Sequence, residues 1–97
     1  MARGYLVVPY RALNDQEKWS AYAKLAVPAF QKMGGRFIVR GMPSKTYEKG
    51  MSQRVVIVEF DSVQKAAEAH ESPAYQEALR ALADGAERDM RLVEGLV

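Results

Sequence analysis

Four side chains in this sequence could together bind or transform a small molecule: Tyr22, Arg40, His70 and Tyr75. His70 is the single histidine, and imidazole is the side chain whose ordinary pKa suits general-base catalysis near neutral pH. The planar guanidinium of Arg40 suits a carboxylate, and each tyrosine offers an aromatic ring with one hydroxyl. If the fold leaves a cleft beside its sheet, these residues could line a small, mostly apolar ligand pocket.

Each of these residues also has a structural interpretation. His70 falls at helical spacing from three small apolar residues, so it could be a partly buried histidine at the end of a helix. Tyr22 and Tyr75 lie on apolar helix faces and could belong to the core. Arg40 could form an ion pair with Glu94 or with an acidic residue of a second chain.

A second arginine, Arg36, precedes Arg40 in the string GGRFIVRG. A hairpin that turns near residues 47–48 would place Arg36 opposite Glu59 and Arg40 opposite Val55. Arg36 and Glu59 are therefore predicted to form a cross-strand ion pair, which contributes a few tenths of a kcal/mol when exposed. Arg40 has no acidic partner in this register.

Several kinds of chemistry find no pattern in the sequence. The chain has no cysteine, which excludes disulfides and thiolate catalysis, and a lone histidine without nearby carboxylates at matching spacing does not make a metal site. Serine-histidine-aspartate spacing and glycine-rich phosphate loops are also missing, and Glu59 is the remaining candidate acid. We expect no metal and no cofactor.

The chain of 97 residues has the size of one domain, so residues 1–97 are expected to fold as a single unit. Its formal net charge is +2, and its basic residues are scattered among acidic ones, whereas a nucleic-acid-binding surface needs a concentrated basic face. No apolar stretch approaches the roughly 20 residues of a membrane span, and the apolar run at the start is too short for a signal peptide. We expect a cytoplasmic protein that binds neither nucleic acid nor a membrane.

The local patterns predict four strands and two helical regions. A helix capped by Asn14, with Glu17 completing a capping box, is expected to end at Gly34. A second helix starts at Ser62, restarts at Ser72 and stops near residues 84–85. Strands are expected over residues 4–10, where Pro9 ends the first ladder, and over residues 36–41, 54–60 and 90–94, with a hairpin tip in the string EKGMSQ.

This β-α-β-β-α-β order predicts an α+β, ferredoxin-like fold. Its four-stranded antiparallel sheet carries both helices on one face, and right-handed crossovers place the first and third strands in the centre.

Both sides of the predicted strands are apolar. In the first strand, Tyr5 and Val7 point to one side while Leu6 and Val8 point to the other. The helices can cover one side only, and an exposed apolar patch of roughly 400 Å² usually marks an interface. We therefore predict a homodimer joined through the open sheet face, as a dimeric α/β barrel. The alternative is a monomer whose C-terminal strand or hairpin arm folds over that face.

Several strings along the chain are similar to a known family: GYLVV at the start, GGRFIVRG after the first helix, then RVVIVEF, SPAYQEAL and the closing VEG. Together they resemble the small bacterial family called domain of unknown function 1330, within the dimeric α+β barrel superfamily. The resemblance implies this fold and a homodimer, and it implies no established activity. Family members often carry aromatic residues before the SP element, where this chain has Ala69, His70 and Glu71.

Three functions remain open at this level. The first is a homodimeric protein that binds a small apolar or aromatic ligand at Tyr22, Arg40, His70 and Tyr75. The second, implied by the superfamily, is a cofactor-independent monooxygenase- or isomerase-like enzyme acting on a small aromatic or polyketide-like substrate, with His70 as the candidate catalytic residue. The third is a purely structural interaction module, which would contain no enclosed pocket.

Overall fold

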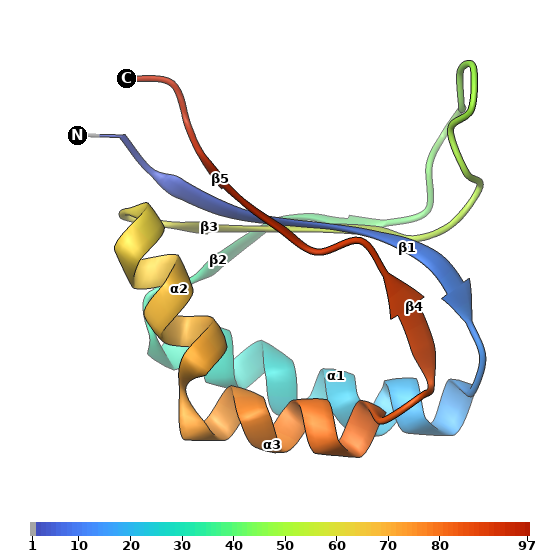
Figure 1. Ribbon diagram of the computed structural model, residues 1–97, viewed down its shortest axis with the longest axis horizontal. Helices are drawn as coiled ribbons and strands as arrows, with labels where there is room; N and C mark the ends of the chain where they lie inside the picture. Colours follow the sequence, from blue (N-terminus) through green and yellow to red (C-terminus); the bar gives the residue numbers. More distant parts are fainter. Residues whose placement is uncertain (1) are drawn as a thin grey trace.

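The computed structural model describes residues 2–97, which form a five-stranded antiparallel sheet with three helices on one of its sides (Figure 1). In chain order the elements are β1 (Gly4–Leu13), α1 (Gln16–Lys32), β2 (Arg36–Gly41), β3 (Val55–Phe60), α2 (Val63–Glu71), α3 (Pro73–Leu82), β4 (Ala86–Arg88) and β5 (Arg91–Glu94). β2, β3 and β1 lie side by side in that order, and β1 pairs on its other edge with both β4 and β5. The predicted ferredoxin-like α+β fold is confirmed, with β1 and β3 at the centre of the sheet.

The predicted last strand, residues 90–94, corresponds to β5, and the short strand β4 precedes it along the same edge of β1. β5 pairs with residues 4–7 of β1, and β4 pairs with residues 10–13, with a register shift between Tyr10 and Ala12. Between the two pairings, the backbone N–H of Asp89 donates to the carbonyl of Pro9 at 2.9 Å. The prediction that Pro9 ends the first ladder is wrong, because proline loses its N–H but keeps its carbonyl, and β1 continues beyond it with a new partner.

The start of α1 also corrects the sequence prediction. Asp15 rather than Asn14 is the N-cap, and its carboxylate accepts a hydrogen bond from the backbone N–H of Lys18 at 3.0 Å. The Asn14 side chain instead donates to the carbonyl of Asp84 at 3.2 Å, which ties the start of α1 to the loop after α3. Glu17 therefore acts as an acidic residue in the first turn and not as the partner in a capping box.

The other helix boundaries follow the predicted signals. Ser62 and Ser72 cap α2 and α3, and each serine hydroxyl accepts a hydrogen bond from the backbone N–H three residues on, at 3.1 and 3.3 Å. Pro73 occupies the first turn of α3, where its missing N–H is of no consequence. Gly34 follows α1 with a φ of 88°, the left-handed conformation that favours glycine.

The core lies between the helices and one side of the sheet. The ring of Phe30 on α1 stacks on Tyr75 of α3 at a centroid distance of 4.4 Å and meets the edge of Phe60 on β3 at 5.9 Å. These contacts join the helix layer to the centre of the sheet. The other buried apolar side chains are Leu6, Val8, Tyr10, Tyr22, Ala26, Ala29, Val58, Ala66, Ala69, Ala78 and Leu82.

The opposite side of the sheet faces away from the helices, and we call it the open face (Figure 1). Strand pairing places Val39, Ile57 and Val7 side by side across β2, β3 and β1. The two-sided apolar character predicted for the strands is therefore present. By the same alternation and pairing, the open face consists of Tyr5, Val7, Pro9, Arg36, Val39, Val55, Ile57, Glu59, Arg91 and Val93.

Residues 42–54 form an arm that connects β2 to β3. Its tip turns at Glu48, which has a φ of 52°, and the ring of Tyr47 is 72% exposed. Figure 1 shows the arm and the C-terminal segment rising on the open side of the sheet at opposite ends. Neither segment folds across the open face, contrary to the monomer alternative.

Replacing Gly35 by alanine should lower the stability of the fold. A Cβ at this position would lie 2.9 Å from both the carbonyl oxygen of Phe30 and the ring of Phe60. We expect Gly35→Ala to reduce the free energy of unfolding by about 1–3 kcal/mol, measured by urea denaturation. Gly41→Ala is the matched control, because a Cβ at Gly41 meets nothing within 4 Å in the described chain. Equal stability of the two variants would contradict this account of the packing.

Candidate functional site

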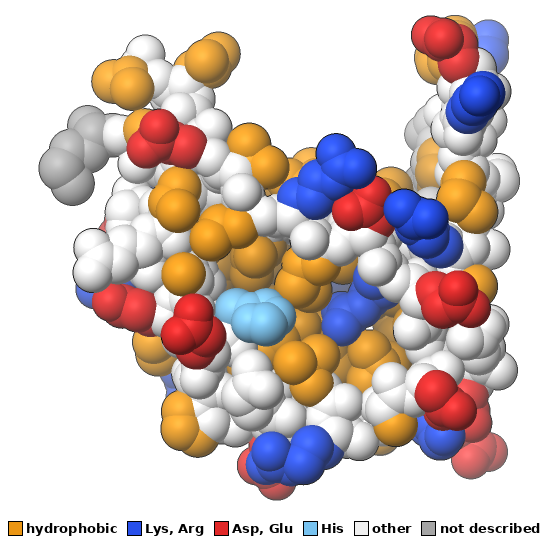
Figure 2. All heavy atoms as spheres, viewed as in Figure 1, with side chains coloured by type: hydrophobic (Ala, Val, Ile, Leu, Met, Phe, Trp, Pro, Cys, Tyr) orange, Lys and Arg blue, Asp and Glu red, His pale blue; other side chains and the backbone are white. Residues whose placement is uncertain are grey.

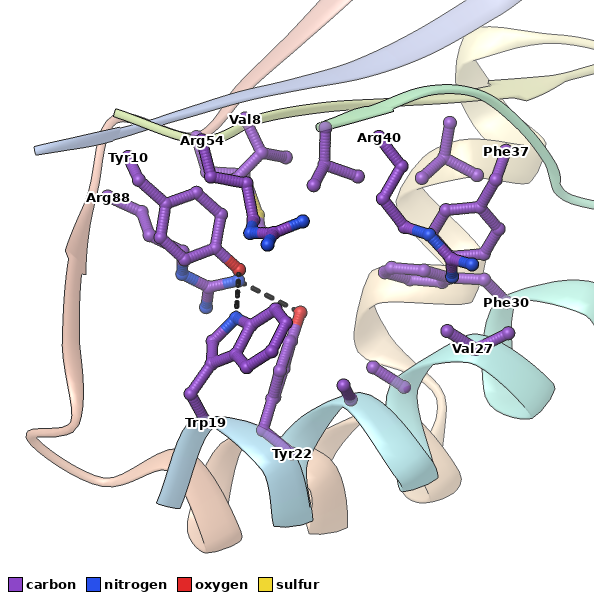
Figure 3. A pocket seen from close by; sticks show the side chains of 15 residues that line it. Val8, Tyr10, Trp19, Tyr22, Val27, Phe30, Phe37, Arg40, Arg54 and Arg88 are labelled. Atoms are coloured by element: carbon purple, nitrogen blue, oxygen red, sulfur yellow. Dashed lines mark hydrogen bonds between the residues drawn. The ribbon is translucent and has the colours of Figure 1, made fainter. Parts of the chain in front are cut away.

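A cavity of about 320 Å³ lies between α1 and the helix-facing side of the sheet (Figure 3). The backbone of α1 packs mainly against α3 and stays away from the strands, so large side chains span the space between α1 and the sheet. The part of the lining that comes from α1 is Trp19, Tyr22, Ala23, Ala26, Val27 and Phe30. The part that comes from the sheet and its connections is Val8, Tyr10, Phe37, Arg40, Arg54, Val56, Val58, Arg88 and Met90.

Figure 3 shows that the two ends of this cavity differ in chemistry. At one end, polar groups of several elements point toward one another: Tyr10, Trp19, Tyr22, Arg54 and Arg88. The other end is formed by Val27, Phe30 and Phe37, with Arg40 beside the Phe37 ring. A ligand that fills the cavity would meet several hydrogen-bond donors at the first end and mostly hydrocarbon, with Arg40 beside it, at the second.

Each arginine of the lining rests on an aromatic ring. The guanidinium carbon of Arg54 lies 4.7 Å from the ring centroid of Trp19, and that of Arg40 lies 5.4 Å from the ring of Phe37. Arg88 lies 4.8 Å from the ring of Tyr22. Such stacking is favourable and limits the orientations of the guanidinium plane, while the edges of that plane keep their N–H donors.

Buried tyrosine hydroxyls form a hydrogen-bond network that holds Arg88 in position. Arg88 donates from Nη1 to the Tyr22 hydroxyl at 2.9 Å, and the hydroxyls of Tyr22 and Tyr75 are 2.8 Å apart. Burial raises the pKa of Tyr22 far above the usual value for a phenol. Tyr22 is therefore a neutral hydroxyl that fixes Arg88 in place. Nearby, the indole N–H of Trp19 donates to the Tyr10 hydroxyl at 3.1 Å.

The lining carries positive charge without an acidic counterpart. The cavity residues from the described part of the chain include arginines but no Asp, Glu or His. Within residues 2–97, Arg40, Arg54 and Arg88 form no ion pair with an acidic side chain. The arrangement can bind and orient a small molecule, and it offers no carboxylate or imidazole for acid–base catalysis.

The structure brings together only part of the predicted site. Tyr22 and Arg40 line the cavity, whereas Tyr75 lies behind Tyr22 and contacts it through the hydroxyl. His70 lies at the end of α2 beside a second, more open pocket, which shares Met90 with the cavity, and its ring is visible at the surface in Figure 2. The ring of His70 is 5.0 Å from that of Tyr75, in the position expected for a partly buried histidine at a helix end.

The predicted site did not include the cavity residues Tyr10, Trp19, Arg54 and Arg88, whose side chains carry polar atoms. The helical spacing that grouped Trp19 with Tyr22 was available, and so was the alternation that puts Arg54 on the same side as Val56. Arg88 gave no such signal, because the short strand β4 that carries it was not predicted.

The predicted pairing of Arg36 with Glu59 is confirmed on the open face. Arg36 donates from Nε to the Glu59 carboxylate at 2.9 Å, and the Tyr5 hydroxyl donates to the same carboxylate at 2.9 Å. These hydrogen bonds lower the pKa of Glu59. The register predicted for Arg40 is wrong, because a bulge between Phe37 and Val39 shifts the pairing by one residue, and Arg40 lies opposite Val56. This shift turns Arg40 toward the helices and into the cavity.

Among residues 2–97, His, Asp and Glu side chains do not gather in a group of three or more that could hold a metal ion. Over the same residues, every helix is too short or too polar to cross a membrane.

The same α+β fold occurs in several solved structures. The chain belongs to the family described as domain of unknown function (DUF1330), which matches residues 3–96. The family resemblance inferred from the sequence strings is therefore confirmed. No match was found among the curated proteins.

Solved structures with a similar fold come from several bacteria. A protein of unknown function from Rhodopseudomonas palustris, RPA0582, is 22% identical, with a TM-score of 0.69 over 96% of this chain and 80% of that chain. A nipsnap family protein with unknown function from Agrobacterium tumefaciens is 16% identical, with a TM-score of 0.62 over 95% and 86%. SnoaB, a cofactor-independent oxygenase from Streptomyces nogalater, is 13% identical, with a TM-score of 0.61 over 99% and 94%. At these identities the likeness is one of fold.

The hydroxyl pair behind the cavity should show energetic coupling. Tyr22→Phe takes a hydrogen-bond partner from both Arg88 and the Tyr75 hydroxyl, and Tyr75→Phe removes one of the two partners of the buried Tyr22 hydroxyl, so each should cost about 1–3 kcal/mol of unfolding free energy. The double variant should cost less than the sum, by about 0.5–3 kcal/mol, in a double-mutant cycle measured by urea denaturation. Tyr47→Phe, at an exposed ring of the arm, should change nothing. Strict additivity of the two core replacements would contradict the network.

Proposed function

We propose that this protein is a homodimer that binds a small apolar or aromatic molecule in the cavity between α1 and the sheet. The observation that carries the proposal is the cavity itself, whose lining is mostly aromatic and aliphatic, with a few polar groups at one end. Ligand sites usually have this composition, and about 320 Å³ falls at the lower end of their usual size. A purely structural interaction module would need no such cavity.

The same lining favours binding over acid–base catalysis. Burial keeps Tyr22 neutral, and His70, the candidate base, lies in a different pocket. SnoaB is a cofactor-independent oxygenase, but its likeness to this chain concerns the fold. An oxygenase or isomerase activity therefore rests on analogy of fold alone, whereas ligand binding rests on residues of this chain.

The open face supports the homodimer. Val7, Val39 and Ile57 form a continuous apolar row on it, and burying such a row releases water from apolar surface. A second copy related by a two-fold axis would cover the face with the same residues. Figure 2 shows the hollow between the arm and the C-terminal segment that this second copy would enter.

Replacing Val39 by lysine should separate the dimer. Val39 is 41% exposed on the open face, and Leu25 is 39% exposed on α1, so the two positions are matched in exposure within one chain. A lysine charge buried between two sheets is strongly unfavourable, whereas one on the outer surface of α1 stays hydrated. We expect light scattering to give the mass of one chain for Val39→Lys and of two chains for Leu25→Lys. A wild-type protein that scatters as a single chain at micromolar concentration would contradict the proposal.

Filling the cavity should weaken binding of a neutral aromatic probe. Trp19 is the single tryptophan of the chain and lines the cavity, so its fluorescence should report binding of 2-naphthamide. Ala23→Met adds volume inside the lining and should lower the affinity roughly tenfold or more. Ala21→Met, at an exposed position of α1, is the control and should bind as the wild type does. An unchanged titration with Ala23→Met would place the ligand elsewhere.

A further inference from the structure

We propose that the ligand of this cavity is an organic anion, namely a small aromatic or apolar carboxylate whose acidic group binds Arg54 and Arg88. The inference rests on the proposed function and names the class of ligand. In this arrangement the carboxylate lies at the polar end of the cavity, and the apolar body of the ligand extends toward Phe30 and Phe37 (Figure 3).

Within the described residues, no acidic side chain balances the charges of Arg54 and Arg88. Arg54 and Arg88 are partly buried, and neither forms an ion pair with an acidic side chain of residues 2–97. Other arginines of this chain do pair, as Arg36 pairs with Glu59 and Arg91 with Asp89. Burying a cation without an anionic partner costs free energy. A bound carboxylate would supply the negative charge that the cavity lacks.

The polar end of the cavity offers several hydrogen-bond donors. A guanidinium carries five N–H donors, and Arg88 uses one of them on Tyr22. Arg54 stacks on Trp19 and, within the described chain, donates no side-chain hydrogen bond. The Tyr10 hydroxyl accepts from Trp19, which leaves its own hydrogen to donate. These donors converge on one end of the cavity, in the geometry that suits a planar carboxylate.

The charge and composition of the cavity lining disfavour other classes of ligand. A cationic ligand would meet the like charges of Arg40, Arg54 and Arg88. A nucleotide would place its polar sugar and base against hydrocarbon beyond its phosphates. A neutral aromatic compound would fit the apolar end but leave the guanidinium groups without a partner. An aromatic or apolar carboxylate matches both ends.

The test compares two probes of nearly equal shape, 2-naphthoate and 2-naphthamide, by isothermal titration calorimetry on the full chain. We expect the naphthoate to bind wild-type protein roughly tenfold to a hundredfold more tightly than the amide, as charge-assisted hydrogen bonds require. Raising the salt concentration should weaken the naphthoate more than the amide. Arg54→Met and Arg88→Met should each reduce this preference at least several-fold.

Arg80→Met is the matched control, because Arg80 lies exposed on α3 outside the cavity lining, and this variant loses the same charge. It should bind both probes as the wild type does. If Arg88→Met fails to fold because Tyr22 loses its partner, Arg54→Met carries the test, since Arg54 has no such buried contact. Circular dichroism and thermal melting establish which variants are folded.

Equal affinity for the two probes in wild-type protein would overturn the charge inference while leaving the aromatic binding site in place. Binding of neither probe would overturn both the inference and the proposed function. A preference for the naphthoate that Arg54→Met leaves intact, or that Arg80→Met removes, would overturn the assignment to this cavity.

Discussion

Stacking between arginine and aromatic side chains holds α1 away from the sheet, and the cavity depends on that separation. Trp19 and Tyr22 project from α1, and Arg54 and Arg88 approach them from the sheet, with guanidinium-to-ring distances of 4.7 and 4.8 Å. Long side chains with flat faces can keep two layers apart without filling all the space between them. Smaller aliphatic residues at these positions would allow the helix to close onto the strands.

The alternation of side chains along β3 links this cavity to the second face of the sheet. Val56 and Val58 point toward the helices and line the cavity, while Val55 and Ile57 belong to the open face. One central strand therefore contributes to the cavity on one side and to the open face on the other.

Sequence reasoning succeeded where a signal acts over a few neighbouring residues. Ser62 and Ser72 cap helices and Gly34 ends one, because each satisfies backbone groups or dihedral angles within one turn. The predictions were wrong where the pairing between two strands decides the structure. The bulge in β2 moved Arg40 by one position, and β1 continued past Pro9 because the Pro9 carbonyl still accepts a hydrogen bond from Asp89.

The element order and the two-sided apolar sheet could be inferred from the residue pattern, because alternation and helical spacing act within each segment. The composition of the cavity could not. Arg88 and Tyr22 are 66 residues apart and hydrogen-bond because β4 folds back along the end of β1, whereas His70 lines another pocket. Contacts between distant segments depend on how whole layers pack, and no local pattern encodes that choice.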